Sequence, residues 1–432
     1  MQQQPENSGK ELKVGGYTAH YTLIICSLLY LVNYMDRQIM AAVLEPMKLA
    51  LGLSDTQAGS LQTIFLLGIA LCSLPVSFLV DRWSRRKAIS VMAILWSIGT
   101  LLTGFGRNFI SLALPRALVG VGESGFSAGG TAIISASYKP ESRGKVLGVF
   151  NLVIPIGAAL GVVLGGYLSK NYGGWSTPFF AFAVPGIVLG ILALFMRDYK
   201  TVKNLDERGH KRGLFSSAFM LFRIPTLKWL YIGYGIRNIM NFSVLAWLSA
   251  FFMRSRSIDE AKAGMLAGGV LLMAMFGAII GGILADAWQK KNNRARMLLP
   301  VIGDSLAAII LIIALYLNMQ NLGFLVILLW GAMVMLGTPA LTAVTQDVVP
   351  PAVKGFSYGI ALFSMYFLGG AWGPILVGTF SDVFGGGAEG LKNALYIASL
   401  SGFVASVVLW LGSRTYADDM AKVRDTTLQE EK

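Results

Sequence analysis

The chain has 432 residues, of which 55% are hydrophobic and 14% are charged, and its formal net charge at pH 7 is +13. Soluble domains carry about 25% charged residues, so this composition excludes an ordinary soluble protein and indicates one that lies in a lipid bilayer. The excess of basic residues is usual for the cytoplasmic loops of such proteins, and we therefore expect no nucleic-acid partner.

Apolar stretches of the length that crosses a membrane recur along the whole chain. A helix of about 20 apolar residues spans a hydrocarbon core of about 30 Å. The predicted spans are residues 19–45, 56–80, 87–107, 109–136, 146–169, 177–196, 227–253, 262–288, 297–317, 322–347, 355–381 and 391–413. The sequence therefore predicts an all-α polytopic membrane protein with 12 transmembrane helices in two pseudo-symmetric bundles of six.

Polar segments separate the two bundles and flank them. We predict a cytoplasmic N-terminal tail over 1–16, an N-terminal six-helix bundle over 17–196, a cytoplasmic linker over 197–226, a C-terminal six-helix bundle over 227–413 and a cytoplasmic C-terminal tail over 414–432. The N-terminal tail lacks the basic start, short apolar core and cleavage site of a secretory signal. We therefore expect no cleaved leader.

Lysine and arginine are concentrated in alternate loops, over residues 82–87, 139–145 and 290–296. The positive-inside rule assigns these loops and both termini to the cytoplasm. We therefore expect a multi-pass protein of the inner or plasma membrane, with anionic lipid headgroups as further partners of its basic loops.

The first span carries two opposite charges, Asp36 and Arg37, inside the apolar stretch from Tyr21 to Val43. A charge at the centre of a bilayer costs about 2.5–3.5 kcal/mol on insertion scales, and such residues usually mark an ion or substrate pathway. This pair indicates transport.

The loop after the second span of each bundle repeats one pattern, an acid at a helix end followed by basic residues. The two sequences are VSFLVDRWSRRKAI and GGILADAWQKKNNRAR. We expect the residues of these loops to form a conformational gate, with simple loop solvation and orientation as the alternative. The predicted gate residues are Asp81, Arg82, Arg85, Arg86 and Asp286.

The fourth span carries Arg116 and Glu123, which are seven residues apart and therefore lie on one face of a helix. A carboxyl group beside an arginine can alternate between an ionised, paired state and a protonated, free state. We expect Asp36 and Glu123 to carry protons, and Arg37 and Arg116 to act as switch and anion clamps. The alternative is an ion-pair network that only holds helices together, although buried pairs seldom repay their desolvation.

Glycines at spacing four occur in the fifth span at Gly157, Gly161 and Gly165, and in the eighth at Gly277 and Gly281. Such spacing lets two helices approach closely. The pattern permits ordinary tight packing or a sliding interface between the two bundles.

The C-terminal bundle carries polar residues that add no negative charge. We list Arg237, Asn238, Asn241, Thr338 and Thr342 as candidates for substrate binding. For Arg237 the alternative is that its charged end reaches the membrane interface. We expect Asp304 to be structural and close to the cytoplasmic surface.

Six plus six spans, a long central linker and the D-R-x-x-R-R-K loop resemble the major facilitator superfamily. Within it, NYMDRQIMAAVLEP, SLQTIF, PRALVGVGESGFSAGGTAIIS and VIPIGAALGVVLGG resemble the Spinster family. This resemblance implies two halves related by an axis along the membrane normal and proton-linked transport of lysophospholipids or sphingolipid phosphates. The family's first-span pair falls on Asp36 and Arg37, and its fourth-span pair on Arg116 and Glu123.

We therefore expect a monomeric, proton-coupled secondary transporter of an amphipathic lipid that works by alternating access. A similar set of four charges resembles that of anion:cation symporters, so a symporter of small organic anions such as sugar acids is the alternative. The sequence contains no P-loop, metal-ligand cluster or Ser/His/Asp arrangement, so we expect neither an enzyme nor a cofactor, and the proton gradient supplies the energy. A receptor that binds without transporting is the third interpretation.

Overall fold

The computed structural model describes residues 15–198, 220–350 and 353–430, and the regular structure of these residues is helical throughout. The first group of helices comprises α1 (Tyr17–Leu51), α2 (Asp55–Arg82), α3 (Arg85–Gly104), α4 (Phe109–Glu123), α5 (Phe126–Ser137), α6 (Pro140–Asn171) and α7 (Thr177–Ala193). The second group comprises α9 (Pro225–Arg256), α10 (Glu260–Gln289), α11 (Ala295–Tyr316), α12 (Leu322–Leu336), α13 (Thr338–Asp347), α14 (Lys354–Ser364), the π-helical segment η2 (Met365–Gly370), α15 (Trp372–Val383) and α16 (Gly387–Glu430). The predicted all-α fold is confirmed.

The membrane spans agree with the predicted count. In the described part of the chain, 11 helical stretches are long and apolar enough to cross a membrane, and the shorter apolar helix α7 matches the remaining predicted span. Three spans are interrupted: Ser124 and Gly125 separate α4 from α5, Gly337 separates α12 from α13, and η2 lies between α14 and α15. Helix α16 continues through the predicted C-terminal tail as far as Glu430.

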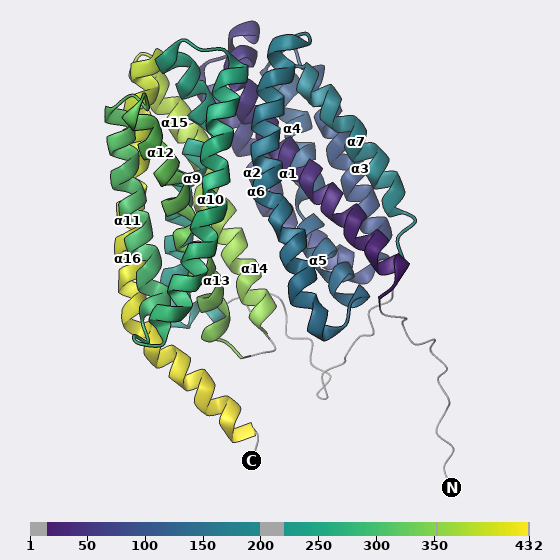
Figure 1. The fold of residues 1–432 in the computed structure, drawn as a ribbon, viewed down its shortest axis with the longest axis vertical. Helices are drawn as coiled ribbons and strands as arrows, with labels where there is room; N and C mark the ends of the chain where they lie inside the picture. Colours follow the sequence, from purple (N-terminus) through teal and green to yellow (C-terminus); the bar gives the residue numbers. More distant parts are fainter. Residues whose placement is uncertain (1–14, 199–219, 351–352, 431–432) are drawn as a thin grey trace.

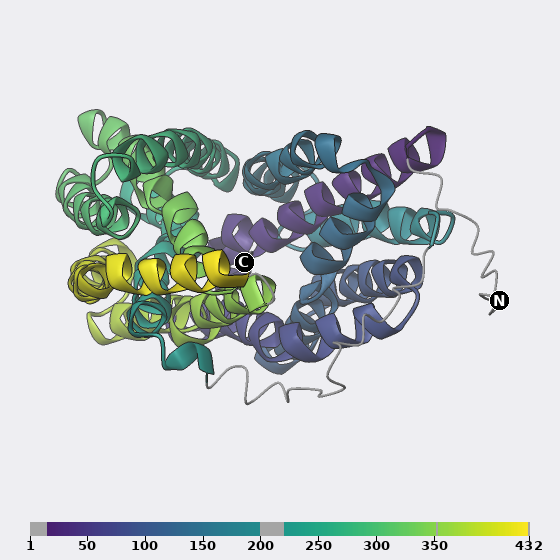
Figure 2. The ribbon, with the colours of Figure 1, turned by 90° about the horizontal axis from the view of Figure 1, so that it is seen from below.

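The helices form two groups that lie side by side (Figure 1 and Figure 2). We call α1–α7 the N-half and α9–α16 the C-half. Most of the predicted linker, residues 199–219, lies outside the described residues. We call the face at which α1 begins and α16 ends the terminal face. The two groups run close together near the opposite face and diverge toward the terminal face (Figure 1).

Glycines set the closest helix contacts within each half. A Cβ atom built on Gly161 would lie 2.4 Å from the backbone oxygen of Met35 in α1, and one on Gly281 would lie 1.9 Å from that of Leu336 in α12. The spacing-four glycines therefore serve tight packing inside each half. Other glycines lie between the halves, since a Cβ on Gly166 of α6 would lie 2.2 Å from the oxygen of Glu260 in α10.

These contacts predict a large difference between two glycines of α10. Gly281→Ala places a methyl group against the backbone of α12, and overpacking of this kind typically costs about 1–3 kcal/mol. Gly269→Ala is the matched control, because its Cβ would meet Leu328 at an ordinary 3.7 Å. We expect a clear fall in the unfolding temperature of detergent-solubilised protein for Gly281→Ala only. Equal unfolding temperatures for both variants would contradict the assigned packing.

Candidate functional site

Close helix contacts bury the charged face of α4. A Cβ atom on Gly120 would lie 2.3 Å from the oxygen of Phe65 in α2, and one on Gly122 would lie 2.7 Å from the nitrogen of Trp96 in α3. Because α4 packs backbone to backbone against two neighbours, the two charged side chains of α4 are enclosed by these helices. Arg116 is 0% exposed and Glu123, the last residue of α4, is 2% exposed.

An ion pair joins α1 to α4. Arg37 Nε lies 2.7 Å from Glu123 Oε2, and the same nitrogen donates to Asn33 Oδ1 at 3.2 Å. The guanidinium also lies over the ring of Tyr34, with its central carbon 4.8 Å from the ring centroid. Glu123 Oε1 has no hydrogen-bond partner among the described residues. The carboxylate of Glu123 is thus held mainly by one cation.

The other two predicted charges have neutral partners. Asp36 accepts a hydrogen bond from Thr100 of α3 through Oδ2. Arg116 donates from Nη2 to Gln62 Oε1 at 3.3 Å and lies over the ring of Phe65. Within the described part of the chain, Asp36 Oδ1 and Arg116 Nε and Nη1 make no hydrogen bond.

The N-half therefore contains two acids and two arginines whose bonding capacity is only partly used. An unsatisfied buried polar group costs about 1–3 kcal/mol, and more when it is charged. Groups of this kind can take up a proton or bind an ionic ligand without first breaking an existing bond. The predicted set of Asp36, Arg37, Arg116 and Glu123 is brought together across α1 and α4, with Arg37 paired to Glu123 and not to its sequence neighbour.

The C-half contains a buried ion pair that sequence reasoning missed. Arg237 Nε donates to both carboxylate oxygens of Asp304 at 3.0 Å, Nη1 donates to Thr338 Oγ1 at 3.1 Å, and Nη2 donates to the oxygen of Val334 at 2.6 Å. Arg237 is 3% exposed and Asp304 is 1% exposed. The expected surface position of Asp304 is wrong, as is the alternative of an interfacial Arg237. The signal that could have found the pair is that each buried charge needs an opposite one.

The remaining C-half candidates lie around this pair. Asn238 Nδ2 donates to the oxygen of Tyr234 at 2.7 Å, and Asn241 Nδ2 donates to Asn238 Oδ1 at 3.2 Å. Thr342 donates to the oxygen of Thr338 at 3.1 Å. The oxygen Asn241 Oδ1 is buried and lacks a hydrogen-bond partner in residues 15–198, 220–350 and 353–430.

The sequence matches a known family of membrane transporters over most of its length. Residues 26–374 match the family model of the Major Facilitator Superfamily. The chain belongs to this superfamily. It is therefore a multi-pass membrane transporter and not an enzyme.

The relatives agree with the resemblance to Spinster. Protein spinster homolog 1 of Xenopus laevis is 26% identical over 408 residues, which cover 88% of this chain and 77% of the frog protein. The sphingosine-1-phosphate transporter SPNS2 of Mus musculus is 25% identical over 379 residues, which cover 83% of this chain and 69% of the mouse protein. A crystal structure of a bacterial homolog of the human lysosomal transporter Spinster, inward-facing and unoccupied, matches with a TM-score of 0.85 at 24% identity. It covers 94% of this chain and 99% of that one.

Two of the predicted gate residues, Arg86 and Asp286, make contacts within their own halves. Arg86 donates to the oxygens of Leu194 and Met196 and lies 3.9 Å from Asp198 Oδ2. Asp286 pairs with Arg296 at 2.8 Å, which also pairs with Asp347 at 2.8 Å. Arg85 is buried, and the side chains of Asp81 and Arg82 lie outside the described residues. Their role as a gate stays a prediction.

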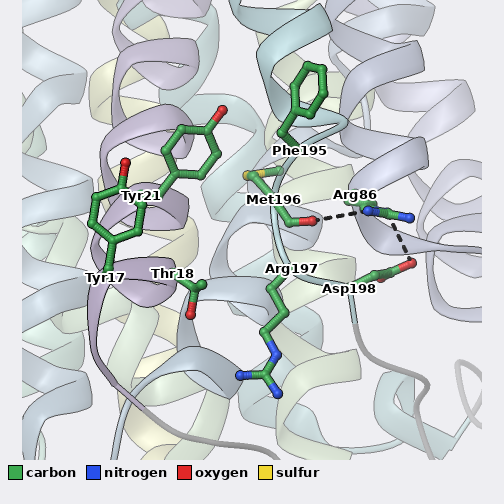
Figure 3. Close-up of a pocket in the computed structure, with 8 residues that line it drawn as sticks. All are labelled: Tyr17, Thr18, Tyr21, Arg86, Phe195, Met196, Arg197 and Asp198. Carbon is green, nitrogen blue, oxygen red and sulfur yellow. Dashed lines mark hydrogen bonds and ion pairs between the residues drawn. The ribbon is translucent and has the colours of Figure 1, made fainter.

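A hollow of about 600 Å³ opens at the terminal face beside Arg86 (Figure 3). It lies between the start of α1 and the residues that follow α7, and its lining residues are Tyr17, Thr18, Tyr21, Arg86, Phe195, Met196, Arg197 and Asp198. The charged residues Asp36, Arg37, Arg116 and Glu123 of the N-half do not line it. The hollow is therefore separate from the candidate site.

Charged contacts join the two halves near the opposite face. Arg254 of α9 donates to Glu45 Oε2 of α1 at 2.6 Å and to Asp55 Oδ1 of α2 at 2.6 Å. Asp382, at the end of α15, accepts hydrogen bonds from the backbone nitrogens of Asp55 at 3.0 Å and Thr56 at 2.8 Å. Charge-assisted hydrogen bonds thus join the two halves at this face.

A second charged contact between the halves joins the end of α6 to the start of α10. Lys170, at the end of α6, pairs with Asp259, which precedes α10. The hydrogen bond from Lys170, together with one from the backbone of Lys262, keeps the pKa of the Asp259 carboxyl below its ordinary value. This pair is partly exposed, so we expect it to contribute less than the buried Arg254 cluster.

We predict that Arg254→Ala shifts the protein toward a form open at the opposite face, because it removes the cation that joins α9 to Glu45 and Asp55 of the N-half. Asp55 keeps its pair with Lys48 at 2.6 Å, but that pair lies within the N-half. A cost of about 1.4 kcal/mol to the closed form changes the ratio of the two forms tenfold. Spin labels at the exposed positions Leu49 and Val383, in a protein whose native cysteines are replaced by alanine, report the separation of the halves.

The matched control for this measurement is Lys392→Ala, which removes a cation that, among the described residues, pairs with Glu389 of its own helix. We expect longer label distances in Arg254→Ala and an unchanged distribution in Lys392→Ala. Unchanged distances in both variants would show that the Arg254 cluster does not hold the halves together.

Proposed function

We propose that this protein is a proton-coupled transporter that moves an amphipathic lipid with an anionic headgroup by alternating access. The observation that carries the proposal is the ion pair of the partly buried Arg37 with the buried Glu123, next to Arg116. Arg116 Nε and Nη1 have no hydrogen-bond partner among the described residues. The site thus offers an acid that can change its protonation and a cation with unused donors.

The proton is carried by Glu123 and Asp36 in this proposal. A carboxyl group in an apolar environment binds a proton more readily when its cationic partner moves away. Arginine stays charged throughout and can exchange one anionic partner for another. A substrate anion that takes the place of Glu123 beside Arg37 therefore favours proton uptake by Glu123, which links substrate binding to the proton.

The anionic headgroup is bound by Arg37 and Arg116 from the N-half. The unpartnered oxygen of Asn241 in the C-half accepts a hydrogen bond from a hydroxyl or ammonium group of the same substrate. Arg237 is fully occupied by Asp304, Thr338 and Val334, so it shapes the wall of the site together with Asn238 and Thr342. The lipid substrate is supported by the similarity to the sphingosine-1-phosphate transporter of mouse. A lysophospholipid or sphingoid phosphate supplies the anionic headgroup that these cations require.

The closed opposite face supports alternating access. Near that face, Arg254 donates hydrogen bonds across the two halves and Asp382 accepts them. These bonds have to break before the substrate can pass there. The basic loops favour a cytoplasmic terminal face in the inner or plasma membrane. One chain supplies every residue of the proposed site, so we propose that the protein works as a monomer.

We predict that Asp36→Asn and Glu123→Gln each abolish lipid accumulation driven by a proton gradient in proteoliposomes, because the substituted amides cannot carry a proton. Both variants should still elute as folded monomers and unfold cooperatively on heating. The control is Glu389→Gln, whose carboxyl is 76% exposed and should be dispensable for transport. Gradient-driven accumulation in both Asp36→Asn and Glu123→Gln would exclude these residues as proton carriers.

We predict that anionic lysolipids raise the unfolding temperature of the purified protein and that sugar acids do not. A ligand that binds only the folded protein stabilises it in proportion to its concentration over Kd. Arg116→Ala should weaken lysolipid binding about tenfold or more, since a hydrogen bond to a charged group contributes about 1.5–3 kcal/mol.

The control for this panel is Arg414→Ala, because Arg414 stacks on Trp410 of the same helix. It should bind lysolipid as the wild type does. Stabilisation by sugar acids and not by lysolipids would replace the lipid substrate with a small organic anion, the alternative function.

A further inference from the structure

The segment η2 interrupts the eleventh span with a π-helical turn. The backbone nitrogen of Ala371 donates to the oxygen of Tyr366 at 2.8 Å, five residues earlier in the chain. Such turns are rare, and they occur frequently at functional sites because they change the direction of the side chains they carry. The side chain of Tyr366 is one of those that η2 carries.

Glycines fix η2 to the C-half. A Cβ atom on Gly369 would lie 1.6 Å from the oxygen of Gly235 in α9, and one on Gly370 would lie 2.7 Å from the ring of Phe242. Because the backbones of η2 and α9 touch, η2 moves with α9. Tyr366 also packs against Phe242, with 5.7 Å between the ring centroids. Tyr366 therefore moves together with the C-half.

Tyr366 contacts the charged site of the other half. Its hydroxyl oxygen accepts a hydrogen bond from Arg37 Nη1 at 3.2 Å. The Nε of the same guanidinium faces Glu123. One cation is thus shared between an acid of the N-half and a phenol of the C-half.

The charged and titratable groups around this cation come from several helices. Asp36 lies next to it on α1, and Arg116 and Glu123 lie on α4. Tyr30 and Tyr34 of α1 and Tyr366 of η2 supply the phenols. Asp36 is the second anion available to Arg37 when Glu123 is neutral.

We propose that Tyr366 couples the protonation of Glu123 to the separation of the two halves. With Glu123 ionised, the guanidinium of Arg37 is held in place and its Nη1 bonds Tyr366, which adds a bond between the halves in the closed form. When Glu123 takes a proton from water, its attraction for Arg37 falls. The guanidinium then turns toward Asp36 or a bound anion, the bond to Tyr366 breaks and the C-half is released. This inference rests on the proposed function.

A second bond between the halves provides a matched control. Thr63 of α2 donates from Oγ1 to the oxygen of Ala371, the residue that follows η2, at 2.5 Å. This bond is buried and joins the same two parts of the molecule, but it involves no charged group. Thr63→Val removes this neutral bond, whereas Tyr366→Phe removes the bond to Arg37.

The test is a double-mutant cycle on the spin-labelled protein, with labels at Leu49 and Val383 and Glu123→Gln as the mimic of the protonated acid. We expect Glu123→Gln and Tyr366→Phe each to increase the population with separated halves. The double variant should have the same population with separated halves as Glu123→Gln alone, because the bond from Arg37 to Tyr366 is already broken in Glu123→Gln. Thr63→Val should add its effect independently, as uncoupled sites do.

Additive effects of Glu123→Gln and Tyr366→Phe would overturn the proposal, because Tyr366 would then act as one more contact between the halves. An unchanged label distribution in Tyr366→Phe would overturn it as well. The cycle requires no transport measurement, so it separates this inference from the proposed function. Failure of the wild type to accumulate lipid in a proton gradient refutes the proposed function and leaves the cycle as an independent result.

Discussion

A bilayer offers no water to a buried charge, and this constraint explains the arrangement of the N-half. Arg37, Arg116, Asp36 and Glu123 lie where the partners of each must come from neighbouring helices. Glycines let α4 touch α2 and α3 along the backbone, which closes the site to solvent. The same closeness limits how many partners each charge can reach, so Asp36, Arg116 and Glu123 are satisfied only in part among the described residues. In the function that we propose, the ligand and the proton supply the partners that the helices do not provide.

The two halves use their buried charges differently. Arg237 makes four hydrogen bonds to three partners, and Asp304 shares both carboxylate oxygens with it. A fully bonded pair of this kind resists change, since removal of one partner typically costs about 3–5 kcal/mol. The N-half instead keeps free donors and acceptors beside its ion pair. We infer that the C-half acts as a fixed wall while the N-half responds to the proton and the substrate.

The sequence predicts what depends on local spacing. Apolar length locates the spans, and the seven residues between Arg116 and Glu123 put both on one face of a helix. It does not predict which helices meet. The pairs Arg37 with Glu123 and Arg237 with Asp304 depend on packing between distant segments, as does the contact from Arg37 to Tyr366 over 329 residues. The glycines at spacing four show the same limit. Their spacing indicates a close helix contact but does not say with which helix, and the structure places their neighbours in their own half.

Asp382 gives the opposite face a further property. A helix begins with backbone N–H groups that have no partner inside the helix. In α2 the nitrogen of Gln57 is bonded by the Ser54 hydroxyl, but those of Asp55 and Thr56 are bonded by Asp382 of the C-half. The cap of this helix is therefore divided between the two halves. In the alternating-access cycle that we propose, each opening of the face uncaps the first turn of α2 and leaves two donors to water, so the proposed transport and the fraying of one helix end belong to the same motion.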